Sequence, residues 1–256
     1  MFGTIIQDAY KKHELNEIVD ALGELCNPND TYGWASAGIY CFWDYHTKEV
    51  LYIGLAVDLT ERFKQHNGII PMDLNACKYE QITSYFEERE KIGYSVFLQS
   101  PLSQPVVRKN IYKWFNYNPE EFSIADFTNE QSKNDLRRLE GILIEAFRQK
   151  HGALPKWNRV SGSIDGQRAT LSGNYEIIRD MTNQRLSPLV SRSTLRELAS
   201  NPTYTWYENF IHGIRQMILF FGMSFNEALP FILKTDSLKT YERIEQEAYL
   251  KKTFVL

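Results

Sequence analysis

The chain has 256 residues, of which 43% are hydrophobic and 24% are charged, a balance typical of a soluble globular protein with one sizeable core or two modest ones. No run of residues approaches the roughly 18–20 apolar positions of a membrane-spanning helix, and acidic residues interrupt the N-terminus too early for a signal peptide. We therefore expect a cytoplasmic protein without membrane contact. The cysteines, Cys26, Cys41 and Cys77, share no metal-ligand spacing and are expected to be reduced thiols.

The net charge of −3 argues weakly against a nucleic-acid partner, but the charge is unevenly distributed. Residues 1–128 hold 11 basic and 18 acidic residues, whereas residues 129–256 hold 18 and 14. The segment 129–196 alone holds 12 basic and 7 acidic residues. A polyanion would therefore meet a basic surface formed by the middle of the chain, although solvated helix faces would give the same counts.

The first elements are a helical leader and a hairpin. Residues 1–35 are predicted as the leader, because apolar residues between Leu15 and Leu25 recur at helical spacing. A turn at 27–30 ends it. Two short apolar segments, 37–42 and 50–54, then flank a polar turn and predict an antiparallel pair of strands.

A capped helix follows the hairpin. Asp58 with Glu61 three residues later is typical of a helix start, so a helix is predicted from Leu59 to about Asn67. The later predictions are an acidic helix at 72–92, a strand at 94–98, an irregular insertion at 101–128, a long amphipathic helix at 131–150, a Gly-, Ser- and Arg-containing stretch at 159–173 and several helices in 174–256. Together they predict an α+β fold, an α/β sandwich whose small three-stranded antiparallel sheet is flanked by helices.

Two tripeptides on the hairpin carry the strongest functional signal. They are Gly38-Ile39-Tyr40 and Tyr52-Ile53-Gly54, with eleven residues between them. Six fixed residues at about 5% frequency each arise by chance in a chain of this length only a few times in a million. At this point the sequence resembles the GIY-YIG endonuclease superfamily.

The resemblance extends beyond the tripeptides over roughly residues 36–160. Arg62 follows Tyr52 by ten residues on the predicted helix, and His66 lies one turn further along the same face. Glu140 stands where the family places a metal-binding glutamate on a later helix. The segment Pro155-Lys156-Trp157-Asn158 resembles the family's closing motif. This implies a nuclease core at 36–162 with insertions at about 68–128, leaving 174–256 as a helical C-terminal region for DNA contact or dimerisation.

The implied chemistry is metal-dependent hydrolysis of phosphodiester bonds. Glu140 would hold one Mg²⁺, with Mn²⁺ as a substitute, and Arg62 would grip the scissile phosphate with its fork of donors. Tyr40 is the implied general base or water-orienting group. A phenol with an ordinary pKa near 10 needs help at neutral pH, for which His66 is the first candidate and Lys48 a weaker one.

The remaining site assignments are less direct. Tyr52 would complete the hydrogen bonds around the water, and Asn158 is expected to steady the site more than to touch the reaction. Taken singly, the two tyrosines are good strand formers that need only pack, and a helical arginine is usually solvent-exposed. Glu140 on an apolar helix face favours function by itself, because a carboxylate there is costly unless it is paired or metal-bound.

Two spacings depart from a minimal core of this family. The 73 residues between His66 and Glu140 leave room for insertions that wrap DNA or mediate dimerisation, and the seventeen between Glu140 and Asn158 are also many. Helicase-contacting modules, helix-hairpin-helix modules and long linkers with small DNA-binding repeats are not found in the sequence. The chain therefore looks most like the restriction branch of the family.

That branch implies a type II-like restriction endonuclease that cuts double-stranded DNA at a short site. A palindromic site would call for a homodimer, and a restriction enzyme would have a cognate DNA methyltransferase as a genetic partner. Arg159 and Arg168 are further candidates for DNA contact, as is Lys48. Two alternatives remain open: a nuclease of low specificity in phage defence or DNA processing, and a catalytically silent DNA-binding protein.

Overall fold

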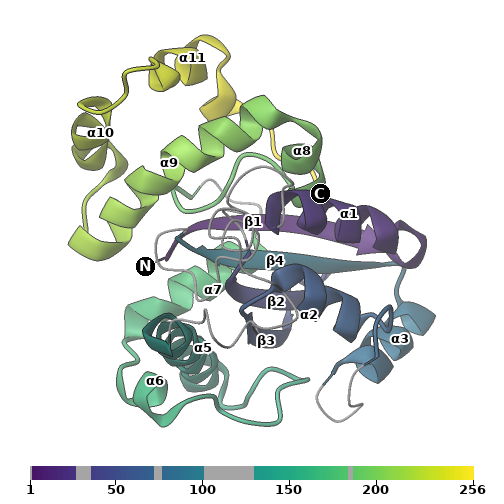
Figure 1. Ribbon diagram of the computed structural model, residues 1–256. Helices are drawn as coiled ribbons and strands as arrows, with labels where there is room; N and C mark the ends of the chain where they lie inside the picture. Colours follow the sequence, from purple (N-terminus) through teal and green to yellow (C-terminus); the bar gives the residue numbers. More distant parts are fainter. Residues whose placement is uncertain (1, 27–35, 72–76, 101–129, 184–186) are drawn as a thin grey trace, which may run out of the picture.

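The computed structural model describes residues 2–26, 36–71, 77–100, 130–183 and 187–256 (Figure 1). The fold is α+β and contains one antiparallel sheet in the strand order β1-β4-β2-β3. Its strands are β1 (Phe2–Lys11), β2 (Gly38–Asp44), β3 (Val50–Ala56) and β4 (Lys91–Gln99). The predicted hairpin and the strand at 94–98 are confirmed, and the sheet has one strand more than expected.

The additional strand, β1, comes from the segment predicted as a helical leader. Its residues alternate between the two sides of the sheet, with Ile6 and Tyr10 in one core and Ile5 in the other. It pairs antiparallel with β4, placing Ile5 opposite Phe97. The helical part of the leader is confirmed as α1 (Leu15–Cys26). The predicted turn at 27–30 and the insertion at 101–128 lie outside the described residues.

Helices cover both faces of the sheet, so the predicted sandwich has three layers (Figure 1). The first core, which contains Tyr40 and Phe42 of β2, is covered by α1, α2 (Leu59–His66), α3 (Tyr79–Glu88) and α8 (Leu195–Ser200). The second core, which contains Ile39, Cys41 and Trp43 of the same strand, is covered by α5 (Glu130–His151) and α7 (Tyr175–Thr182). Adjacent residues of β2 thus point into different cores, as the pleat requires.

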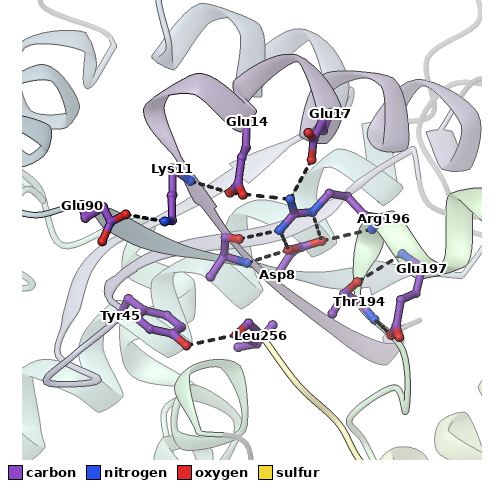
Figure 2. Close-up of polar contacts among 11 residues, drawn as sticks. Asp8, Lys11, Glu14, Glu17, Tyr45, Glu90, Thr194, Arg196, Glu197 and Leu256 are labelled. Atoms are coloured by element: carbon purple, nitrogen blue, oxygen red, sulfur yellow. Dashed lines mark hydrogen bonds and ion pairs between the residues drawn. The ribbon is translucent and has the colours of Figure 1, made fainter.

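A network around Arg196 fastens the N-terminal strand to α8 (Figure 2). The Arg196 guanidinium contacts the Asp8 carboxylate at 2.9 Å and the Glu17 carboxylate at 2.8 Å. Asp8 is buried, so this pairing offsets the cost of taking a carboxylate out of water. The helix start beside it is a capping box, in which Glu197 N donates to Thr194 Oγ1 at 3.1 Å and Thr194 N donates to the Glu197 carboxylate at 3.0 Å.

The C-terminal region is helical, as predicted, and packs onto the sheet through β1. It contains α9 (Pro202–Phe221), α10 (Phe225–Leu233), α11 (Thr240–Gln246) and a final turn, η5 (Tyr249–Lys251). Glu208 and Arg215 of α9 form a fully buried ion pair. Arg215 also donates to Thr4 Oγ1 of β1 at 3.1 Å, and Tyr249 Oη donates to Glu208 at 2.7 Å. Of the described helices, none combines the length and apolar character needed to cross a membrane.

Candidate active site

The outer edge of β3 organises the candidate site. An edge strand leaves every second backbone amide without a partner strand, and here other segments supply the partners. Trp157 N donates to Leu51 O at 2.8 Å. Asn158 then holds the next exposed pair, accepting from Ile53 N at 3.0 Å and donating to Ile53 O at 2.8 Å. Two residues further on, the backbone amide of Leu55 lies close enough to the Glu140 carboxylate of α5 to lower its pKa.

Asn158 therefore holds the backbone of the edge strand. Both ends of its amide are used by the backbone of Ile53, the central residue of the second tripeptide. This double hydrogen bond fixes the strand on which Tyr52 and Gly54 lie. The closing motif at 155–158 thus acts on the site through the edge strand.

Each tripeptide glycine lies where a side chain would collide with its surroundings. Tyr40 pairs with Gly54 across the hairpin, and a Cβ at Gly54 would lie 2.6 Å from the Tyr40 hydroxyl oxygen and 2.7 Å from the Tyr52 ring. A Cβ at Gly38 would lie 2.4 Å from the backbone oxygen of Phe97 in β4. Glycine at these two positions lets the Tyr40 hydroxyl cross over β3 and β2 sit tightly against β4.

A buried hydrogen-bond chain joins Tyr40, His66 and the backbone of Lys78. His66 Nε2 lies 2.6 Å from Tyr40 Oη, and Lys78 N donates to His66 Nδ1 at 2.9 Å. Burial, together with the nearby charges of Arg62 and Lys78, lowers the pKa of His66 to about 3, so the ring is neutral at physiological pH. Because a backbone amide can only donate, Nδ1 is the unprotonated nitrogen and Nε2 carries the proton.

This tautomer changes the role expected for His66. Its Nε2–H donates to Tyr40 Oη, so that nitrogen cannot accept the tyrosine's proton as the predicted relay required. The histidine instead orients the phenol and leaves the Tyr40 proton for another acceptor. The Asp58 cap that starts α2 sets this geometry from a distance, since Glu61 N donates to Asp58 Oδ1 at 2.9 Å and the helix ends at His66.

Both tyrosines are held as neutral phenols. Burial raises the pKa of Tyr40 well above 10; Tyr52 adds to the increase and Arg62 opposes it. Burial likewise raises the pKa of Tyr52, against the effect of its side-chain hydrogen bond with Tyr40. The two rings lie 5.8 Å apart between centroids. Neither hydroxyl can ionise at neutral pH without an added positive charge.

Arg62 is the charge shared by the whole group. It lies close enough to Tyr40, Tyr52, His66 and Glu140 for its charge to act on the pKa of each. The structure thus brings together five of the residues that the sequence singled out. They come from two strands, α2 and α5, and are separated by up to 100 positions in the chain.

Glu140 fits a hard metal ion as a single protein ligand. Burial raises its pKa to about 7, with the Leu55 amide and Arg62 opposing the increase, so a bound cation would stabilise the ionised form. Among the described residues no group of three or more His, Cys, Asp and Glu gathers as a metal cage. A lone carboxylate suits Mg²⁺, which keeps several waters and takes substrate phosphate oxygens.

The glycine beside Glu140 allows α5 to approach the chain that follows the closing motif. A Cβ at Gly141 would lie 2.7 Å from the Ser163 backbone oxygen, and one at Gly166 would lie 2.3 Å from the Arg138 oxygen. Gly166 belongs to α6 (Ile164–Arg168), which packs closely on α5. This contact fixes the rotation of α5 and hence the direction of the Glu140 side chain.

Other predicted residues lie apart from this group. Lys48 is in the β2–β3 turn with its ammonium 4.8 Å from the Trp43 ring and 4.4 Å from the Tyr45 ring, and no interaction with Tyr40 is seen. It therefore does not serve as the expected helper of the phenol. Arg168 is exposed and lines a polar cavity of about 640 Å³ between α5 and α6, together with Arg137 and Arg138.

Lys78 is a site residue that the sequence did not indicate. It precedes α3, is buried, and places its ammonium 5.0 Å from the centroid of the Tyr52 ring. The charge of Arg159 acts on it, so this predicted DNA-contacting residue does lie beside the group. A lysine that follows 73–77 without any motif gives no signal for such a position. Comparison of the chain with protein-family models, curated proteins and solved structures finds no match.

Proposed function

We propose that the chain is a metal-dependent endonuclease of the GIY-YIG type that hydrolyses phosphodiester bonds in double-stranded DNA. The observation that carries this proposal is the buried contact of 2.6 Å between Tyr40 and His66, at the centre of a group that also contains Tyr52, Arg62 and Glu140. Perturbed pKa values in one cluster of converging side chains are typical of catalytic sites.

Arg62 would hold the scissile phosphate and offset the charge that develops as water attacks phosphorus and the bond to the leaving oxygen breaks. Its position among the two tyrosines and Glu140 supports this role. Tyr40 would orient the attacking water through its hydroxyl. Since His66 already donates to that hydroxyl and both phenols are neutral, the water's proton would pass to a phosphate oxygen of the substrate, with Tyr52 completing the hydrogen bonds around the water.

Glu140 would bind Mg²⁺ beside the phosphate, and the ion would polarise the phosphoryl oxygen and stabilise the leaving oxygen. The residues of the chain set where this happens: the Leu55 amide and the packing of α6 on α5 hold the carboxylate, and Asn158 holds the strand beneath it. We further propose that cleavage is site-specific, as in type II restriction enzymes, with two copies of the chain acting on a palindromic site.

Incubation of supercoiled plasmids with the protein and Mg²⁺ or Mn²⁺ tests the proposal. We expect cleavage by the wild type and none by Glu140→Ala. Discrete bands would support site specificity, whereas a smear would favour a nuclease of low specificity. Binding without cleavage under all metal conditions would leave a catalytically silent DNA-binding protein, and cleavage that survives Glu140→Ala unchanged would refute the metal assignment.

A further inference from the structure

Lys78 is a buried cation whose positive charge is offset by no acidic side chain among the residues that the structure describes. Only 5% of the residue is exposed, yet within the part of the chain that the structure describes its ammonium forms no ion pair. Its ammonium lies 5.0 Å from the centroid of the Tyr52 ring. Arg159 and Cys77 lie close enough to act on its pKa. A buried charge is costly to the fold unless a counter-charge accompanies it.

The position of Lys78 is fixed by its own backbone. Its amide donates to His66 Nδ1 at 2.9 Å, and its carbonyl accepts from Ile82 N at 2.9 Å in the first turn of α3. The same residue therefore sets the tautomer of His66 and directs a charge over Tyr52. A lysine placed by accident at a helix start would swing its flexible side chain into water.

The charges around this lysine are mostly positive. Arg62, Lys78 and Arg159 are cationic, His66 is neutral, and Glu140 is the one carboxylate that the described contacts place among them. Burial, followed by the repulsion of Arg159, lowers the pKa of Lys78, and Cys77 opposes the decrease. One phosphate held at Arg62 and Glu140 would not neutralise this group.

We propose that Lys78 and Arg159 form a second phosphate subsite, which holds the DNA phosphate next to the scissile one at Arg62. This inference rests on the proposed nuclease function and describes how the active site would bind the DNA strand. Arg62 and Lys78 both lie beside Tyr52, so a single strand that passes Tyr52 would meet both subsites in turn. The subsite would set the register of the strand over Tyr40 and carry no sequence preference.

The salt dependence of DNA binding tests this subsite without relying on cleavage. Binding of a fluorescent duplex is measured in EDTA over a series of salt concentrations for the wild type, Lys78→Met, Lys78→Arg and Lys12→Met. Lys12 is exposed in the short helix η1 (Lys12–Glu14), which follows β1, and controls for the loss of one positive charge. We expect Lys78→Met to bind several-fold more weakly and to lower the magnitude of the salt slope by about 0.9, the value for one phosphate contact.

The control and the rescue variant should separate the possible outcomes. Lys12→Met should match the wild type, and Lys78→Arg should recover the slope. A wild-type slope and affinity in Lys78→Met, with the wild type itself binding DNA, would overturn the subsite and leave the nuclease proposal standing. An absence of salt-dependent DNA binding by the wild type would overturn both.

Thermal unfolding without DNA gives a second measurement. The change in melting temperature would have the opposite sign if Lys78 served the stability of the fold. Removing a buried, uncompensated charge relieves a cost, so Lys78→Met should melt at a higher temperature than the wild type. A lysine that serves the fold would instead lose stability on substitution. A lower melting temperature for Lys78→Met would therefore contradict the proposal, whatever the binding data show.

Discussion

Gly54→Ala tests the most precise feature of the candidate site. The added Cβ would lie 2.6 Å from the Tyr40 hydroxyl, and ordinary contact begins at 3.4 Å, so the phenol must move by about 0.8 Å. The hydroxyl is held at 2.6 Å from His66, and a shift of this size away from His66 weakens that hydrogen bond by lengthening it to about 3.4 Å. Overpacking of this kind costs about 1–3 kcal/mol, and a misplacement near 1 Å costs on the order of 100-fold in rate.

The assay pairs thermal unfolding with the rate of plasmid nicking. Gly23→Ala is the matched control, because Gly23 lies in α1 and an added Cβ there meets nothing within 4 Å. We expect that control to keep its activity and to gain about 0.5–1 kcal/mol from the better helix former. If Gly54→Ala unfolds and nicks DNA like the wild type, the close approach of Tyr40 to β3 is wrong, and the chemistry built on it fails too.

Three further predictions concern the scaffold. Glu208→Gln should destabilise the protein by about 3–5 kcal/mol in denaturant melts, because it leaves Arg215 buried without its counter-charge. Burial alone would raise the pKa of Glu208, but Arg215 and the hydrogen bonds outweigh burial and lower the pKa from 4.5. The ion pair therefore contributes its stability above pH 4.5. The difference in stability between variant and wild type should shrink as the pH falls below that value. Arg196→Ala should cost a similar amount by stranding the buried carboxylate of Asp8, and equal melts would refute the network. Asn158→Ala should lose about 1–3 kcal/mol in the same assay, since both backbone groups it holds on the edge strand lose their partner.

The sequence predicted those parts of the fold that depend on local pattern. Two continuous apolar segments on either side of a polar turn specify the hairpin, and the Asp58 cap specifies where α2 begins. The strand β1 was missed because it is held by pairing with β4, about 90 residues away in the chain. Helical spacing further along the leader favoured a helix, and no short-range signal opposed it.

The candidate site divides in the same way. The resemblance to the GIY-YIG family implied Tyr40 and Glu140 as site residues, and the structure brings them into one group around Arg62. The tautomer of His66 could not be predicted, because it depends on the amide of Lys78, to which only the folded chain brings it. The burial of Lys78 over the Tyr52 ring is likewise a property of the packing.

Metal-dependent nicking of supercoiled plasmid by Glu140→Gln, beside the wild type, tests the central claim most directly. Glu130→Gln is the matched control, since Glu130 is an exposed acid on the same helix. We expect Mg²⁺-dependent nicking by the wild type and by Glu130→Gln, and a loss of at least 100-fold in Glu140→Gln while its melting temperature stays at or above that of the wild type. Equal nicking by all three proteins, or none by the wild type with either Mg²⁺ or Mn²⁺, would contradict the account.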